Sequence, residues 1–169
     1  FYKEVFDLRT GALKKLKFRI VPHGHLLDRS LYKPQETTSP TVSMESIFAC
    51  INIAAKENRK AFTMDIPGAY LNATLKDKHV VRFPRDLAAE YVALYPKYVS
   101  YLQEDGTLLM LIEKALYGLV ESSALWYKEI KAFLQNLGYV VHPSDLGVFQ
   151  KKEKNDTITI CLWVDDFLG

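Results

Sequence analysis

Two adjacent acidic residues interrupt an apolar run near the end of the sequence, and they are the first candidates for chemistry. Asp165 and Asp166 lie between Val164 and Phe167, whereas a solvated hairpin tip, the ordinary interpretation of such a pair, usually brings Gly, Asn or Lys with it. Two carboxylates about 4 Å apart repel each other by roughly 4 kcal/mol at an effective dielectric constant of about 20. Because a bound cation, or protonation of one acid, relieves this repulsion, the pair points to a metal site.

A third acid, Asp65, stands in the same setting, directly after the mostly apolar residues 61–64. If this strand and the one that ends at Asp165 are neighbours in one sheet, three carboxylates converge on one point. Oxygen-only ligands favour Mg²⁺ or Mn²⁺ over zinc, and two such ions about 3.5–4 Å apart serve in-line phosphoryl transfer. Spacing alone leaves this convergence open.

The elements that must position these acids mix helices and strands without a βαβ rhythm. Periodicity and turn residues predict two helices, over residues 43–56 with Ser43 as N-cap and over residues 122–137 with Gly138 as C-cap. The expected strands are 2–8, 13–21, 61–64, 79–83, 108–112, 148–151 and 157–164. The fold expected is α+β, with an antiparallel sheet packed on helices. The buried face of the second helix is predicted to be Trp126, Ile130, Phe133, Leu134 and Leu137.

Composition narrows the classes of protein. Of the 169 residues 49% are hydrophobic and 25% charged, which is typical of a globular chain and excludes disorder and coiled coil. No apolar run approaches the roughly 20 residues of a membrane span, so no membrane partner is expected. Cys50 and Cys161 lie in apolar stretches and are interpreted as reduced core residues, which favours an intracellular setting. Residues 1–34 carry a net charge of +5, whereas the whole chain carries only +2, so the rest of the chain is mildly acidic. This distribution predicts a basic segment that faces an anion.

Several stretches, in order, resemble the reverse transcriptase domain of Ty1/copia-type LTR retrotransposons. The similarity runs from about residue 14 to the last residue, and we interpret the chain as an excerpt from a longer protein. The stretches are Lys17-Phe18-Arg19-Ile20-Val21 with Gly24, residues 63–72 (TMDIPGAYLN), residues 115–119 (ALYGL) with Trp126-Tyr127, Gly138-Tyr139 with Asp145 and Phe149, and Trp163-Val164-Asp165-Asp166. Each is weak alone, and their shared order and spacing make the resemblance specific.

The resemblance implies a right-hand polymerase fold, with fingers over about residues 1–60 and mostly palm over about 61–169, truncated before the thumb. Asp65 and Asp165 would be the main ligands of two Mg²⁺ ions, with Mn²⁺ as the alternative metal. Asp166 would be a further acid at the site, and the Ile66 carbonyl would complete one coordination shell.

The resemblance also implies a site for the incoming dNTP. Lys17 and Arg19 would bind its triphosphate, although a solvated strand face is the plain interpretation of these two cations. Tyr70 would exclude a 2′-hydroxyl by its bulk, and without the resemblance it is an ordinary aromatic residue at a strand end. Gly118 would allow close approach of nucleotide or template, where the alternative is a simple turn.

The sequence departs from the family pattern at two positions expected to lie near template or primer. Val120-Glu121-Ser122-Ser123 stands where the family has K-Q-S-P, and Trp163 stands where it has Tyr. The charge of Glu121 is unfavourable near template and nucleotide unless it is paired or protonated. Trp163 removes a hydroxyl and adds bulk beside the catalytic pair.

Three functions remain open from the sequence. The first is an RNA-directed DNA polymerase domain that uses an RNA template, a DNA primer and dNTP, within a Pol polyprotein that also carries integrase and RNase H and acts in cytoplasmic particles. The second is a catalytically inactive remnant that keeps the fold and nucleic-acid binding, and the third is an unrelated metal-dependent phosphohydrolase. The excerpt alone is expected to have little or no processive activity. The tyrosines at 91, 95, 98 and 101 suit base stacking or, more simply, loop packing.

Overall fold

The computed structural model describes residues 2–6, 10–11, 13–18, 21–24, 27–154 and 156–169, with the backbone alone for 2–6 and 14–18. The helices and helical turns are η2 (Arg29–Leu31), α1 (Pro34–Thr37), α2 (Met44–Lys56), η3 (Ala69–Asn72), α3 (Arg85–Leu94), η4 (Pro96–Tyr101) and α4 (Ser122–Asn136). The strands are β1 (Tyr2–Phe6), β2 (Leu13–Phe18), β3 (Thr63–Asp65), β4 (Thr74–Phe83), β5 (Leu108–Lys114), β6 (Val140–His142), β7 (Asp145–Glu153), β8 (Asp156–Trp163) and β9 (Asp166–Leu168). No helix in these ranges is both long and apolar enough to cross a membrane.

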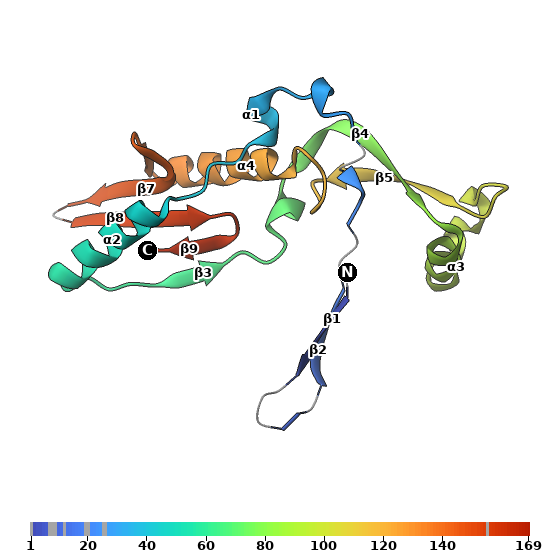
Figure 1. Ribbon diagram of the computed structural model, residues 1–169, viewed down its shortest axis with the longest axis horizontal. Coiled ribbons are helices and arrows are strands. Elements are labelled where there is room, and N and C mark those ends of the chain that lie inside the picture. The colour runs from blue at the N-terminus through green and yellow to red at the C-terminus, as the bar shows by residue number, and fades with distance from the viewer. Residues whose placement is uncertain (1, 7–9, 12, 19–20, 25–26, 155) are drawn as a thin grey trace.

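In the part of the chain that the structure describes, three antiparallel sheets together with the helices confirm the predicted α+β class. The largest has five strands in the order β3-β9-β8-β7-β6, and β1-β2 and β4-β5 form two separate two-stranded sheets. Figure 1 shows the five-stranded sheet at one end, the β4–β5 arm with α3 at the other, and the β1–β2 hairpin projecting between them. Within the large sheet β9 lies between β3 and β8, which joins residues about a hundred positions apart in the chain.

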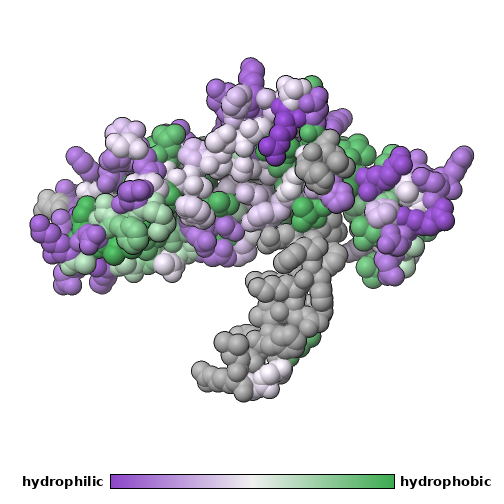
Figure 2. Space-filling model, in the orientation of Figure 1, coloured by the Kyte–Doolittle hydropathy of each residue, from purple (hydrophilic) through white to green (hydrophobic). Residues whose placement is uncertain are grey.

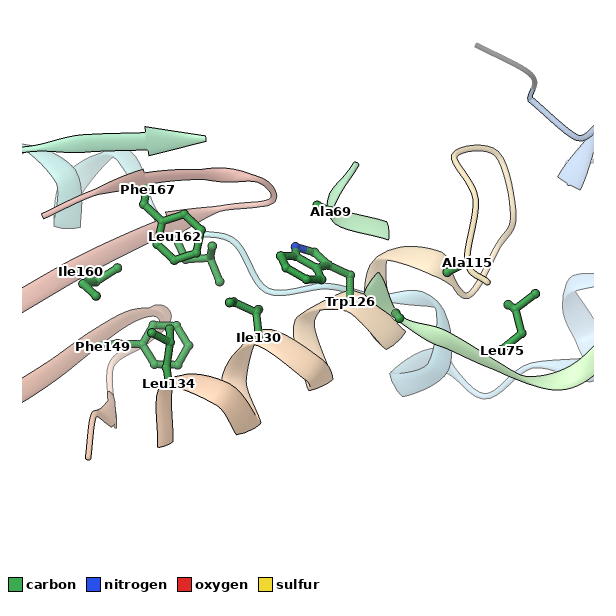
Figure 3. Packing of buried hydrophobic residues seen from close by; sticks show 11 residues of the cluster. Ala69, Leu75, Ala115, Trp126, Ile130, Leu134, Phe149, Ile160, Leu162 and Phe167 are labelled. Carbon is green, nitrogen blue, oxygen red and sulfur yellow. The ribbon is translucent and has the colours of Figure 1, made fainter. Parts of the chain in front are cut away.

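One face of the large sheet packs against α4. Trp126, Ile130 and Leu134 recur at the spacing of one helix face and are all buried. They point toward apolar strand residues on the sheet (Figure 3), namely Phe149, Ile160, Leu162 and Phe167. The prediction for this helix face was wrong at Phe133 and Leu137, which are 58% and 49% exposed, because the sheet covers only the narrower stripe.

The opposite face of the sheet carries α2. Ile47 and Cys50 of this helix pack with Val42, Val148 and Cys161, whereas other apolar residues of the helix, Met44, Phe48, Ile51 and Ile53, stay exposed. Figure 2 shows apolar surface gathered where α2 lies. Both cysteines are free. Burial, followed by the contact with the Cys50 thiol, raises the pKa of Cys161 to about 12, so this thiol stays protonated at neutral pH.

Asp145 fastens the start of α2 to the sheet. Its Oδ2 accepts hydrogen bonds from the Ser43 amide at 3.0 Å and the Ser43 hydroxyl at 2.9 Å, and its Oδ1 accepts from the Gly147 amide at 2.9 Å. Ser43 is the N-cap of α2, as predicted, and its hydroxyl accepts from the Ser46 amide. Burial alone would raise the pKa of Asp145, but the hydrogen bonds from Ser46, Ser43 and Gly147 lower it to about 2.

We expect Asp145→Asn to destabilise the chain at neutral pH by about 2 kcal/mol. The folded chain binds the Asp145 proton more weakly than the unfolded chain, so this carboxylate stabilises the fold above pH about 4, and its contribution is lost as the pH falls toward about 2. Urea unfolding at a series of pH values measures both effects. The exposed Asp86→Asn is the control, and an acid dependence that Asp145→Asn leaves unchanged would contradict the assignment.

The β4–β5 arm ends in a cluster of aromatic side chains. Tyr91 lies 5.0 Å from Tyr95 and 5.5 Å from Tyr98 between ring centroids, and it meets Phe83 edge to face at 5.6 Å. Since these rings pack on one another, the contacts favour loop packing over a stacking platform for nucleic-acid bases.

Candidate active site

The three aspartates singled out in the sequence meet at one edge of the large sheet. Asp65 ends β3 and stands directly opposite Asp166, the first residue of β9. Asp165 lies in the two-residue turn that joins β8 to β9, and its carbonyl oxygen accepts a hydrogen bond from the Ile66 amide at 2.9 Å. The backbone therefore brings together acids that lie far apart in the chain, with Asp166 rather than Asp165 as the direct partner of Asp65.

The turn that presents Asp165 is strained at the residue before it. Val164 has a φ of 58°, a left-handed value that is unfavourable for a β-branched residue. The Trp126 indole donates a hydrogen bond to the Val164 carbonyl at 2.6 Å, which ties the turn to the buried face of α4. Because this hydrogen bond holds the tight turn, it restricts where the backbone of Asp165 can lie.

A cavity of about 400 Å³ lies beside two of the acids. Asp65, Asp166 and Trp163 line it, together with mostly apolar residues. Facing carboxylates on paired strands repel each other, so a cation between them is favourable. Within the described ranges no three His, Cys, Asp or Glu side chains form a group closed enough to hold a metal ion. Oxygen donors alone suit Mg²⁺, which is usually held by one or two carboxylates together with substrate phosphates.

Two tyrosines lie beside Asp165. The Tyr117 hydroxyl donates a hydrogen bond to Asp165 Oδ2 at 3.1 Å. The ring of Tyr117 lies 4.2 Å from that of Tyr70 between centroids, at an angle of 41°. Burial, and then the negative charge of Asp165, raise the pKa of the Tyr70 phenol, so Tyr70 is a neutral, bulky wall beside the acids.

Gly118 follows Tyr117, and the segment of residues 21–24 packs closely against it. Its φ is 102°, and a Cβ at this position would lie 2.6 Å from the Pro22 carbonyl oxygen. A Cβ on Gly24 would in turn overlap the Gly118 carbonyl oxygen. Glycine is required at both positions because the segment that follows the basic hairpin lies directly on the Tyr117 loop.

Glu121 is buried rather than exposed on a template face. Only 5% of the residue is accessible, and its Oε1 lies 2.8 Å from His79 Nε2, a contact that requires a hydrogen between the two atoms. It is also the N-cap residue of α4, where a negative charge is favoured by the helix dipole. Glu121 is therefore paired, which is one of the two conditions under which its charge is tolerated near template and nucleotide. Glu121 and His79 line a surface cavity of about 760 Å³.

Three further predicted site residues, Trp163, Lys17 and Arg19, differ in how much of them the structure describes. Trp163 is the last residue of β8 and is 48% exposed at the cavity of the acids. Lys17 belongs to β2, paired with Lys3, and only its backbone is described. Arg19 lies outside the described residues.

Two residues at the site have no signal of their own in the sequence. Tyr117 stands out only as part of a family motif, and nothing around His79 in the sequence marks it for a role. Their partners, Asp165 and Glu121, are 48 and 42 positions away in the chain. Tyrosines and histidines near acids are too common for such pairs to be identified without the fold.

Comparison with known proteins shows the family of the chain. The sequence model of the family described as "Reverse transcriptase (RNA-dependent DNA polymerase)" matches residues 2–168. The Retrovirus-related Pol polyprotein from transposon RE2 of Arabidopsis thaliana is 27% identical over 158 residues, which is 94% of this chain and 10% of that protein. The Transposon Ty1-H Gag-Pol polyprotein of Saccharomyces cerevisiae is 30% identical over 165 residues, or 97% of this chain and 8% of that protein.

No solved structure matches the chain at a significant level. The chain spans about a tenth of the length of the curated relatives it matches. The family match covers nearly all 169 residues and includes every acid of the site. On this basis the chain belongs to the reverse transcriptase (RNA-dependent DNA polymerase) family, in the branch of the copia-type retrotransposon Pol polyproteins.

Proposed function

We propose that this chain forms the fingers, over about residues 1–60, and most of the palm, over about 61–169, of an RNA-directed DNA polymerase. The enzyme transfers a nucleotide from a dNTP to the 3′-hydroxyl of a primer. One observation carries the proposal: Asp65 stands opposite Asp166 with Asp165 in the adjoining turn, in a chain of the reverse transcriptase family.

The acids supply the donor set that two Mg²⁺ ions need, with Mn²⁺ as the alternative. Asp65 and Asp165 would hold both ions, Asp166 would add a further carboxylate, and the Ile66 carbonyl would complete one shell. When bound, the ions lower the pKa of the primer hydroxyl and neutralise charge on the departing pyrophosphate. Since substrate phosphates supply the other ligands, the protein needs no closed cage of its own.

Other residues would bind and select the nucleotide. Tyr70, held neutral beside Asp165, would exclude a 2′-hydroxyl by its bulk. Lys17 and Arg19 would neutralise the triphosphate. Gly118 supports this arrangement, because the segment that follows the basic hairpin rests against it.

Template and primer would lie along the same edge of the sheet. Trp163 is exposed beside the acids and would contact the primer terminus directly, whereas the buried Glu121 would act on the template through the loop that it anchors. The partners in this proposal are an RNA template, a DNA primer and the rest of the Pol polyprotein, with its integrase and RNase H. The setting proposed is a cytoplasmic particle.

A primer-extension assay tests the proposal. A longer Pol segment that contains this chain is given an RNA template, a labelled DNA primer, dNTP and Mg²⁺. We expect extension that stops when EDTA removes the cation and resumes when Mg²⁺ is restored.

The same assay separates the alternatives. A folded segment that binds the template and primer but never extends it identifies an inactive remnant. Release of inorganic phosphate from dNTP without any extension identifies a phosphohydrolase.

A further inference from the structure

The hydroxyl of Tyr117 reaches a carboxylate of the proposed catalytic site from a separate part of the fold. Tyr117 lies in the loop between β5 and α4, whereas Asp165 lies in the turn between β8 and β9. The two are joined by the 3.1 Å hydrogen bond from the phenol to Asp165 Oδ2. A phenol has only one hydrogen to donate, and here it is directed at the acid.

The loop that carries Tyr117 is held at both ends. At its start, the Ala115 amide donates to the Ala73 carbonyl at 3.0 Å, and Ala115 is fully buried. At its end, the Ser122 hydroxyl donates to the Leu116 carbonyl at 2.6 Å. These bonds hold the backbone of the loop that carries the phenol, so the loop is a fixed support from which the hydroxyl can orient Asp165.

The ring of Tyr117 is fixed independently of its hydroxyl. It lies against Tyr70 at 4.2 Å between centroids, and Tyr70 in turn packs against the core beneath the sheet. Removal of the hydroxyl alone therefore leaves the packing of both rings in place. This separates the two roles of Tyr117, which are to support Tyr70 and to hold Asp165.

We propose that Tyr117 is a positioning residue that holds Asp165 in the orientation needed for divalent-cation binding. An ionised carboxylate offers about four acceptor positions on its two oxygens. Tyr117 occupies one of these on Oδ2, and the acceptor positions that remain would be available to a cation. This inference rests on the proposed function, because it takes the acids to be the cation ligands. Partners of metal ligands commonly change metal affinity or activity by about 10- to 100-fold when they are removed.

Direct cation binding tests this role without any activity measurement. Mn²⁺ is titrated into the 169-residue chain, and free Mn²⁺ is followed by electron paramagnetic resonance. We expect Tyr117→Phe to weaken Mn²⁺ binding by about 10-fold and Asp165→Asn to weaken it further. The matched control is Tyr127→Phe. It removes a phenol that donates to the Leu146 carbonyl at 2.7 Å and makes no contact with the three acids of the site. The Mn²⁺ affinity of this variant should equal that of the wild type.

The outcomes distinguish this inference from the proposed function. Weaker binding in Asp165→Asn with wild-type binding in Tyr117→Phe overturns the role of Tyr117 alone. Unchanged binding in Asp165→Asn overturns the ligand assignment itself, and the role of Tyr117 falls with it.

A second readout guards against a simple loss of folded protein. In primer extension by the longer Pol segment, the Mg²⁺ concentration for half-maximal rate should rise about 10-fold in Tyr117→Phe, with much of the rate recovered at saturating Mg²⁺. A purely structural defect would lower the rate at every Mg²⁺ concentration and leave that midpoint unchanged, which would also overturn the proposal.

Discussion

Asp165→Asn is expected to reduce primer extension by at least about 1000-fold, equivalent to about 4 kcal/mol of transition-state stabilisation. Asn keeps the size of the side chain, and its amide oxygen can still accept the hydrogen bond that Tyr117 donates to Asp165. The charge that attracts divalent cations is lost while the turn keeps its contacts. Single-turnover extension on an RNA template measures the effect.

Two further variants complete this test. Asp65→Asn should show a loss of the same order, because Asp65 lies across the strand pair from the Asp165-Asp166 hairpin. Asp156→Asn is the matched control, since its side chain is 73% exposed at the other end of β8 and should leave extension unchanged. Extension by Asp165→Asn within about twofold of the wild type would refute the assignment of the acids.

Gly147→Ala is expected to lower the free energy of unfolding by about 3 kcal/mol, at the upper end of the usual cost of overpacking. A Cβ at Gly147 would overlap the backbone of Val42 and would lie 2.6 Å from the carbonyl carbon of Thr41. The segment before α2 crosses β7 here, and the Val42 amide donates to the Leu162 carbonyl at 2.9 Å. Backbone on both sides of the contact cannot move away as a flexible side chain would.

Urea unfolding at pH 7 measures this effect, and Gly11→Ala is the comparison. Gly11 has a φ of 69°, but a Cβ added there would meet no atom of the described residues within 4 Å, so alanine carries backbone strain alone. That strain is about 1–2 kcal/mol. If Gly147→Ala is no more destabilising than Gly11→Ala, the close crossing of residues 41–42 over β7 is not as described.

The helices could be predicted from the sequence because their signals are local. Ser43 caps α2 as expected, and the polar serine before a 3.6-residue apolar pattern is sufficient to predict its start. The same holds for α4, which ends within a residue or two of the predicted C-cap at Gly138. The width of the buried stripe of α4 was not local information, since it depends on how much of the helix the sheet covers.

The long-range pairings could not be predicted from spacing. The strand that ends at Asp165 was considered as the neighbour of the strand before Asp65, but β9 lies between these two strands and places Asp166 opposite Asp65. The strands β6 and β9 were also missed, because three residues are too few to show an alternating pattern. β3 is equally short, but it was predicted from the mostly apolar run of residues 61–64 before Asp65. Family resemblance supplied the identity of the acids, whereas the pairing of Glu121 with His79 needed the fold itself.

The strand order of the large sheet has a consequence for synthesis on the ribosome. Among the described strands, β3 pairs with β9 alone. About a hundred further residues must therefore be translated after Asp65 before its partner Asp166 exists. Closing so long a loop is slow and entropically costly. The acidic edge is therefore assembled late, after α4 and the β7–β8 hairpin have formed a platform, and nascent chains released before Asp166 would leave β3 as an unpaired strand that is prone to aggregate.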